Sequence, residues 1–244
     1  MTRYFLSSRL RNPSFWMLLA GLSALSGWLL LIQVEQFIGA QARVAVASDT
    51  FGVTPMVLAP YLSNLKLLVL LALPLLLGPL LASNTHAHPL WLGSRLSSGA
   101  LAGGILLYVW AIAALWVAVL MAGAAALGLG TTLDLQLAVS AWLGVGFLLL
   151  FFAQLHALIV CHARSSASAL LASLSVNLSF VLIDLSASAS GLALDHLSVL
   201  NPLAHYASFL QGRPTVAGLV LLFGSALASY LLLQRRIERM RQGR

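Results

Sequence analysis

Two pairs of histidines are the side chains best suited to metal chemistry in this chain. His86 and His88 are separated by one residue, and His196 and His205 share a second polar stretch with the carboxylate Asp195. A stable metal site needs further ligands and an outer layer of hydrogen bonds that orients them. His86 and His88 could bind a metal at a surface, but we favour two solvated loop histidines and predict no metal site.

The sequence lacks the short motifs of hydrolases and nucleotide-binding enzymes. A phosphate-binding loop needs a glycine-rich turn followed by Lys and Ser or Thr, and neither this pattern nor H-E-x-x-H or G-x-S-x-G occurs. We therefore expect no ATP hydrolysis by this chain alone and assign no catalytic residues. An intramembrane enzyme is the least favoured class, because the apolar segments contain no paired nucleophile and base.

Two ionisable residues, Lys66 and Asp184, stand inside otherwise apolar segments. Such groups are costly in lipid and are functional candidates by default. Each lies near the outer end of its segment, so each could reach water separately or the two could pair at the outer mouth of a helix bundle. Gln154 and Asn177, with His156, could line a path for a substrate, although hydrogen bonds between helices are the commoner use of such residues.

Composition identifies the elements that must hold these residues. Of 244 residues, 60% are hydrophobic and 8% are charged, whereas about a quarter of a soluble domain is charged. The chain is therefore expected to be an integral membrane protein, with no room for a soluble catalytic domain. Cys161 is the single cysteine, which excludes an internal disulfide framework.

Six apolar runs have the length of about 20 residues that a membrane-spanning helix needs, which predicts an all-α protein with one transmembrane domain over residues 1–244. We read the first run as a retained span and not as a cleaved signal. Pro55 and Pro60 are expected to interrupt any long helix before the second run. The predicted spans are residues 15–33, 62–82, 98–127, 135–160, 167–185 and 216–233, followed by a basic tail at 234–244.

The basic residues predict the orientation. Ten Lys and Arg lie in one set of alternating polar segments, which includes both ends of the chain, and three lie in the other set. The positive-inside rule then places both termini on the cytoplasmic side of the cell (inner) membrane. The formal charge of +7 is explained by this topology and by anionic lipid, so no nucleic-acid partner is expected.

Three further segments have a recognisable pattern. The first 14 residues carry Arg3, Tyr4, Arg9 and Arg11, a composition suited to a helix lying in the membrane interface. The polar segment between the second and third spans contains an apolar knob, Pro89-Leu90-Trp91-Leu92, that a partner or the lipid surface must cover. The candidate contact residues of the whole segment are Asn84, Thr85, His86, His88, Pro89, Leu90, Trp91, Leu92 and Arg95. A GxxxG motif at residues 99–103 fits either packing within the chain or a dimer seam.

Several of these features together resemble ABC-2 type permeases. They are Asn12-Pro13 before the first span, Leu58-Ala59-Pro60-Tyr61 before a proline-containing second span, and the stretch His205-Tyr206-Ala207-Ser208-Phe209-Leu210-Gln211-Gly212-Arg213 before the last span. Within that superfamily the chain is most similar to the permeases of gliding motility and of nitrous-oxide-reductase maturation. The resemblance covers essentially the whole chain.

The resemblance implies a six-helix permease of the type V exporter-like fold. It implies pairing with a second permease copy or homologue and with separate ABC ATPase subunits that bind ATP and Mg²⁺, and the motility and maturation members add a periplasmic partner. Residues 84–96 would then form the coupling loop that contacts the ATPase, although the acidic run usual there is absent. The alternative is an ATP-independent carrier or a structural subunit of a membrane complex.

Overall fold

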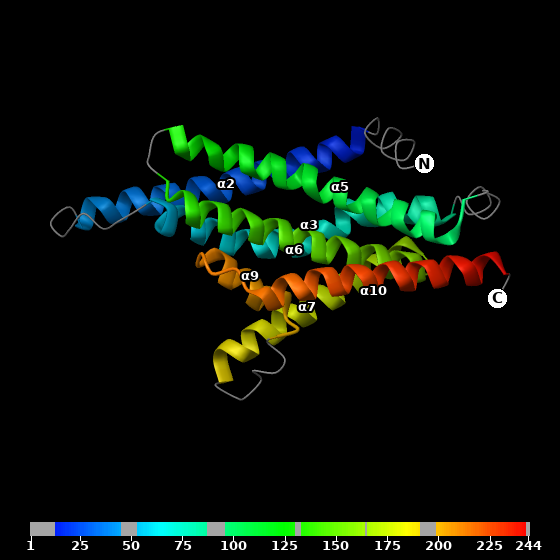
Figure 1. The fold of residues 1–244 in the computed structure, drawn as a ribbon. Helices are drawn as coiled ribbons and strands as arrows, with labels where there is room; N and C mark the ends of the chain where they lie inside the picture. Colours follow the sequence, from blue (N-terminus) through cyan, green and yellow to red (C-terminus); the bar gives the residue numbers. More distant parts are fainter. Residues whose placement is uncertain are drawn as a thin grey trace.

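A computed structural model describes residues 13–44, 53–86, 96–129, 133–163, 165–190 and 199–242, and the regular elements within these ranges are all helices. Figure 1 shows their arrangement. In chain order they are α2 (Pro13–Val44), the π-helical turn η1 (Thr54–Leu58), α3 (Ala59–His86), α5 (Ser98–Ala125), the 3-10 turn η2 (Ala126–Leu129), α6 (Leu135–His162), α7 (Ser166–Ser190), α9 (Pro202–Leu210) and α10 (Val216–Arg241).

Six of these helices are long and apolar enough to cross a membrane: α2, η1 with α3, α5, α6, α7 and α10. The chain is a multi-pass membrane protein, as its composition predicts. The start of α2 and the end of α10 lie toward the same end of the bundle (Figure 1), which we call the proximal end. The end that carries η1 and α9 is called the distal end.

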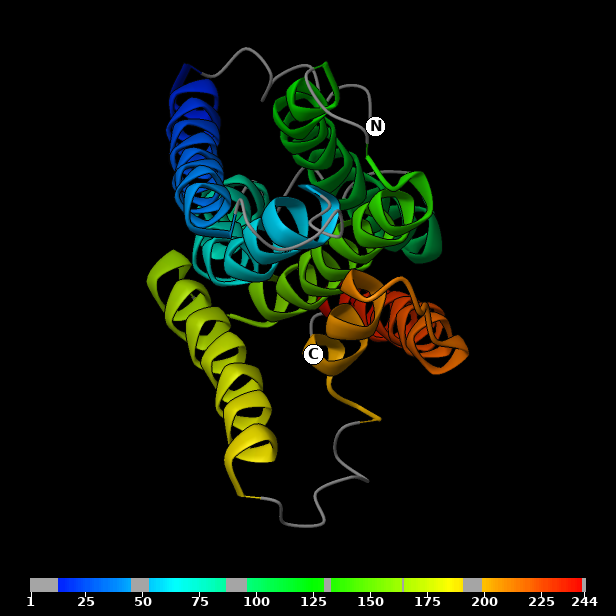
Figure 2. The same cartoon turned by 90° about the vertical axis from the view of Figure 1, so that its left-hand side faces the viewer.

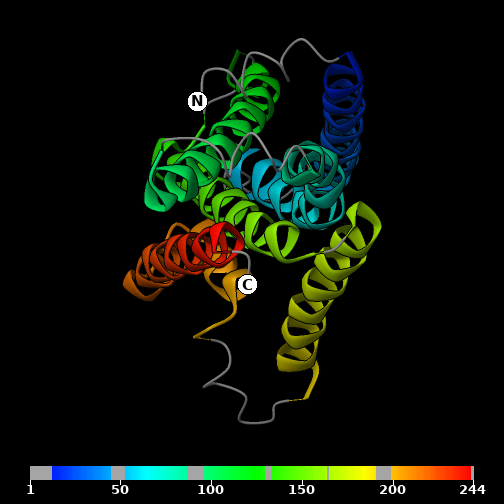
Figure 3. The ribbon, with the colours of Figure 1, turned by 90° about the vertical axis from the view of Figure 1, so that its right-hand side faces the viewer.

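The centre of the bundle is α6, which contacts α3, α5, α7, α9 and α10. Within its most apolar stretch 67% of residues are buried, against 17% in α7 and in α10. Figures 2 and 3 show α2 and α7 on the sides of the bundle, with α7 inclined to the other long helices. The apolar side chains that these outer helices expose, such as Trp28 of α2 and Leu178 of α7, suit a lipid environment, where apolar surface needs no cover from water.

Five of the six membrane-spanning helices are longer than the predicted spans, whereas α5 ends at Ala125, two residues before the predicted end. Residues 34–44 continue α2, and Asn84, Thr85 and His86 end α3 instead of beginning a loop. The predicted interruption at Pro55 and Pro60 is wrong, because η1 leads directly into α3. Pro55 lies in a first turn, where its missing N–H has no intrahelical partner to lose, and a π-helical turn absorbs the irregularity before Pro60.

The segment between α7 and α10 contains the short helix α9, which packs on the protein at the distal end. Asn201 caps its start, with its side-chain oxygen accepting from the Leu203 N–H at 3.0 Å. Gly212 ends it with a φ of +73°, and the Gly212 N–H donates to the Phe209 carbonyl while the Arg213 N–H donates to the Ser208 carbonyl. This is the Schellman pattern, in which glycine takes the left-handed position.

Close packing between α6 and α9 gives a first prediction. A Cβ atom at Gly144 would lie 2.6 Å from the Phe209 Cβ, whereas one at Gly146 would meet nothing within 4 Å. Replacing Gly144 with Ala should destabilise the protein by about 1 to 3 kcal/mol through overpacking. Thermal unfolding in a mild detergent measures the effect, with Gly146→Ala as the matched control; equal stability of the two variants would contradict this packing.

Candidate functional site

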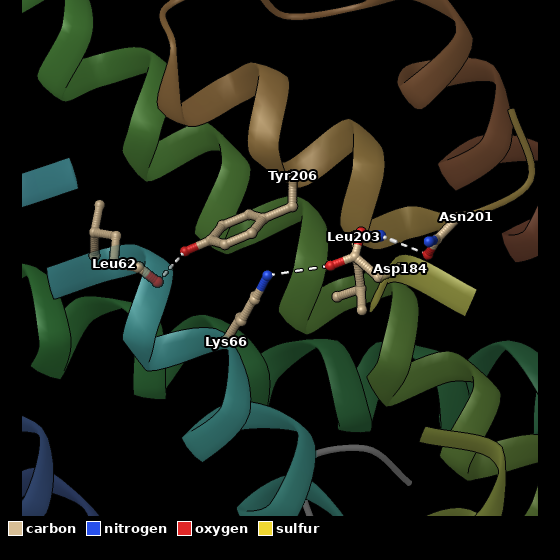
Figure 4. Close-up of polar contacts among 6 residues, drawn as sticks. All are labelled: Leu62, Lys66, Asp184, Asn201, Leu203 and Tyr206. Carbon is tan, nitrogen blue, oxygen red and sulfur yellow. Dashed lines mark hydrogen bonds and ion pairs between the residues drawn. The ribbon is translucent and has the colours of Figure 1, made fainter. Parts of the chain in front are cut away.

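On one face of α3, three residues make polar contacts with α7 and α9, two helices from the C-terminal half of the chain. Leu62, Lys66 and Leu70 are spaced four residues apart, so they follow one another along the same side of the helix. Two of them act through backbone carbonyls and the third through its ammonium group. We call these three positions the α3 stripe, and Figure 4 shows the part of it around Lys66.

At the centre of the α3 stripe is an ion pair between α3 and α7. The Lys66 Nζ lies 3.2 Å from an Asp184 carboxylate oxygen, and the two side chains are 28% and 23% exposed. Each charge is therefore largely removed from its surroundings and is compensated by the other, which is the condition under which ionisable groups are tolerated inside a membrane. Of the two alternatives for Lys66 and Asp184, the structure shows the pair.

A second contact replaces a backbone hydrogen bond that α3 loses at Pro74. Pro74 has no N–H, so the Leu70 carbonyl four residues earlier lacks its normal helical donor. The Asn177 amide of α7 donates to this carbonyl at 2.6 Å, and Asn177 is buried. A neighbouring helix thus satisfies the freed backbone group, which is how prolines are accommodated in membrane helices.

The third contact attaches α9 to α3. The Tyr206 hydroxyl donates to the Leu62 carbonyl at 2.6 Å (Figure 4). On its other side α9 is bound to α6, because the Ser140 hydroxyl donates to the Phe209 carbonyl at 2.8 Å. The His205 ring joins α9 to the start of α10 through the Thr215 hydroxyl at 2.9 Å. The short helix therefore connects α3, α6 and α10 at the distal end.

The arrangement is suited to holding helices together and releasing them, since its members are ion pairs and hydrogen bonds between elements. In the part of the chain that the structure describes, no three His, Cys, Asp or Glu side chains are grouped to hold a metal. The α3 stripe is therefore a polar junction between α3, α7 and α9. It is the strongest candidate for a functional site among the described residues.

The other predicted polar residues have individual placements. The Gln154 amide donates to the Ser225 hydroxyl of α10, so Gln154 and Asn177 both make hydrogen bonds between helices, the commoner of the two uses considered. His156 is fully buried in α6, and neither ring nitrogen has a hydrogen-bond partner among the described residues. Gln154 and Asn177 do not share one site, because Gln154 contacts α10 and Asn177 contacts α3.

Most of the predicted surface residues fall outside the part of the chain that the structure describes. This holds for the interfacial segment with Arg3, Tyr4, Arg9 and Arg11, and for the coupling-loop candidates His88, Pro89, Leu90, Trp91, Leu92 and Arg95. Asn84, Thr85 and His86 are described only as the helical end of α3. The predictions for all these residues stay predictions.

The sequence did not indicate that the Leu62 and Leu70 carbonyls are acceptors or that Tyr206 is a donor. The Leu70 carbonyl could have been found, because a proline in a membrane helix marks the residue four positions before it as needing a donor. Tyr206 stands in a stretch that was noted for its resemblance alone, and its contact with Leu62 depends on how α9 packs. No local signal in the sequence gives that packing.

Comparison with known proteins adds no assignment. No model of a known protein family matches the chain, and no curated protein matches it. The basis for a functional proposal is therefore the sequence pattern together with the geometry of the helices.

The link between Asn177 and Pro74 can be tested with a double-mutant cycle. Asn177→Ala should cost about 1 to 3 kcal/mol of stability, because it leaves the buried Leu70 carbonyl without a donor. The cost should be much smaller in a Pro74→Ala background, where the alanine N–H donates to that carbonyl. Thermal unfolding of the four proteins in detergent gives the coupling, and additive effects would show that the two residues act independently.

The ion pair allows a charge-exchange test. Reversing either charge alone, as in Lys66→Asp or Asp184→Lys, should lower thermal stability, because two like charges would face each other inside the bundle. The double exchange should recover most of the loss, since it restores opposite charges. Glu35→Lys, at an exposed position of α2, is the control for a charge change alone. Failure of the double variant to recover would remove the pair.

Proposed function

We propose that this chain is the membrane subunit of an ABC-2 type transporter, coupled to ATPase subunits that are separate polypeptides. The proposal rests on the resemblance in sequence and on the six membrane-spanning helices. The first of them, α2, begins at the same end of the bundle at which the last, α10, ends. In this assignment the proximal end is cytoplasmic. The subunit pairs with a second permease, which is either the same chain or a homologue.

One observation carries the mechanism: α3 runs from the distal end to the segment assigned to ATPase contact. It ends at His86, inside the proposed coupling loop, and its distal half carries the α3 stripe, to which α7 and α9 are bound. A push on residues 84–96 therefore reaches the proximal end of α3. That helix transmits the displacement to two other elements through three polar contacts.

The chemistry of the α3 stripe fits such a role. An ion pair that is about a quarter exposed can exchange its partner for water or for a polar substrate group at modest cost, whereas a fully buried pair cannot. ATP-driven closure of the ATPase subunits would move α3 relative to α7 and α9 and open or close a path between the two permease halves. The output is export of a substrate or force on a periplasmic partner.

The apolar knob of the proposed coupling loop gives the functional test. Trp91→Asp or Leu92→Asp should abolish ATP hydrolysis that depends on the permease, because a charge replaces the apolar contact with the ATPase, and should leave the helix bundle folded. Trp91→Phe and Leu92→Met are the controls, since both keep the knob apolar. ATPase activity and thermal unfolding are measured on the complex purified in mild detergent.

The complex itself is the decisive observation. A tagged copy of the chain should recover an ATP-binding subunit, identified by mass spectrometry, and the aspartate variants should lose it or its stimulation. Recovery of the chain alone, or with membrane partners that lack an ATPase, would overturn the proposal. Unchanged coupled activity in both aspartate variants would overturn the assignment of the coupling loop.

A further inference from the structure

The last helix continues well past its apolar part. Residues 234–241 of the predicted basic tail are helical, and α10 ends at Arg241. Residues 234–241, which we call the C-terminal arm, turn Ile237 into the bundle together with Leu233 of the preceding turn. Arg235 and Arg239 lie exposed on the opposite face. The arm is therefore packed against the proximal end and does not project freely.

The carboxylate of Glu238, in the C-terminal arm, lies at the start of α5. A Glu238 oxygen accepts from the Ser98 hydroxyl at 2.7 Å and from the Gln234 amide at 3.0 Å. Helix α5 begins at Ser98 and has no acidic residue in its own first turn. Negative charge is favourable at a helix N-terminus, so Glu238 supplies from α10 the charge that α5 lacks.

The arm's guanidinium groups bind backbone carbonyls on either side of that point. The Arg241 Nη2 donates to the Leu96 carbonyl at 2.7 Å, just before α5. The Arg236 Nε lies 3.4 Å from the Cys161 carbonyl in the last turn of α6. Cations are favourable at a helix C-terminus, where carbonyls lack intrahelical donors. Glu238 and Arg236 thus match the start of one helix and the end of its neighbour, while Arg241 attaches the arm to the backbone just before α5.

Close contact between α5 and α10 continues one turn deeper. A Cβ atom at Gly99 would lie 2.7 Å from the Tyr230 hydroxyl, and one at Gly103 would lie 3.8 Å from the same ring. The GxxxG motif at 99–103 therefore packs within the chain against α10. Polar and apolar contacts together hold α5, α6 and α10 to one another at the proximal end.

We propose that the C-terminal arm is a brace that holds the α5 end of the coupling segment in place, with Glu238 and Arg241 as positioning residues. This inference deepens the proposed function and rests on it. The segment 84–96 has two ends, one continuous with α3 and the other bound at Leu96 and Ser98 by the arm. With the α5 end held, a push on the segment is delivered to α3, and through the α3 stripe to α7 and α9.

The first measurement does not depend on any ATPase. A spin label is attached at Leu96→Cys in a Cys161→Ser background, which removes the single native cysteine. Glu238→Ala with Arg241→Ala should raise the mobility of the label in its electron paramagnetic resonance spectrum. Arg235→Ala with Arg239→Ala, on the exposed face of the same arm, should not. Equal mobility in all variants would overturn the brace.

The second measurement tests positioning in the assembled complex. Glu238→Ala should lose most of the ATP hydrolysis that the permease stimulates. Glu238→Gln should retain part of it, because the glutamine oxygen still accepts from Ser98 although the negative charge at the start of α5 is lost. A merely structural role would lower protein yield and melting temperature without this rescue pattern. A mobile label with undiminished stimulation would overturn the positioning role. A mobile label in a protein that binds no ATPase would leave the brace standing and refute the proposed function.

Discussion

The structure depends on one constraint: in the absence of water, a backbone carbonyl that loses its helical donor must find another. Pro74 creates this situation inside α3, and the Asn177 amide resolves it from α7. The ion pair between Lys66 and Asp184 follows the same rule for charge, and the Tyr206 hydroxyl adds a donor to a third position on the same face. The polar groups of α3 therefore fix its contacts with α7 and α9.

These polar contacts explain how α7, which has little buried surface, keeps its position beside α3. In lipid no hydrophobic driving force brings helices together, and the exposed leucines of α7, including Leu178 and Leu182, do not specify its position. Its buried face carries small and polar residues, among them Ser173 and Asn177. A few directional contacts on that face select one register, and α9 is placed by the same means.

The sequence was sufficient for the all-helical organisation with six membrane-spanning helices and for part of the site. Long apolar runs predict the six spans, because lipid requires about 20 residues from each. The two isolated charges left two alternatives open, and the structure shows the pairing of Lys66 with Asp184. All the helices but α5 were predicted too short, since apolarity marks the lipid-facing length and says nothing of how far a helix extends beyond it, as in α10. The role of Tyr206 and the fold of the C-terminal arm depend on contacts between distant segments, which local pattern does not encode.

The pairing of Lys66 with Asp184 also determines how the junction responds to a membrane potential. A single elementary charge moved across the full membrane changes energy by about 2.3 kcal/mol per 100 mV. Held together at 3.2 Å, the two groups have no net charge, so a motion that carries both along the membrane normal does no electrical work. A motion that separates the two charged groups along the membrane normal does electrical work. Voltage would therefore bias separation of α3 from α7 and leave their joint movement unaffected.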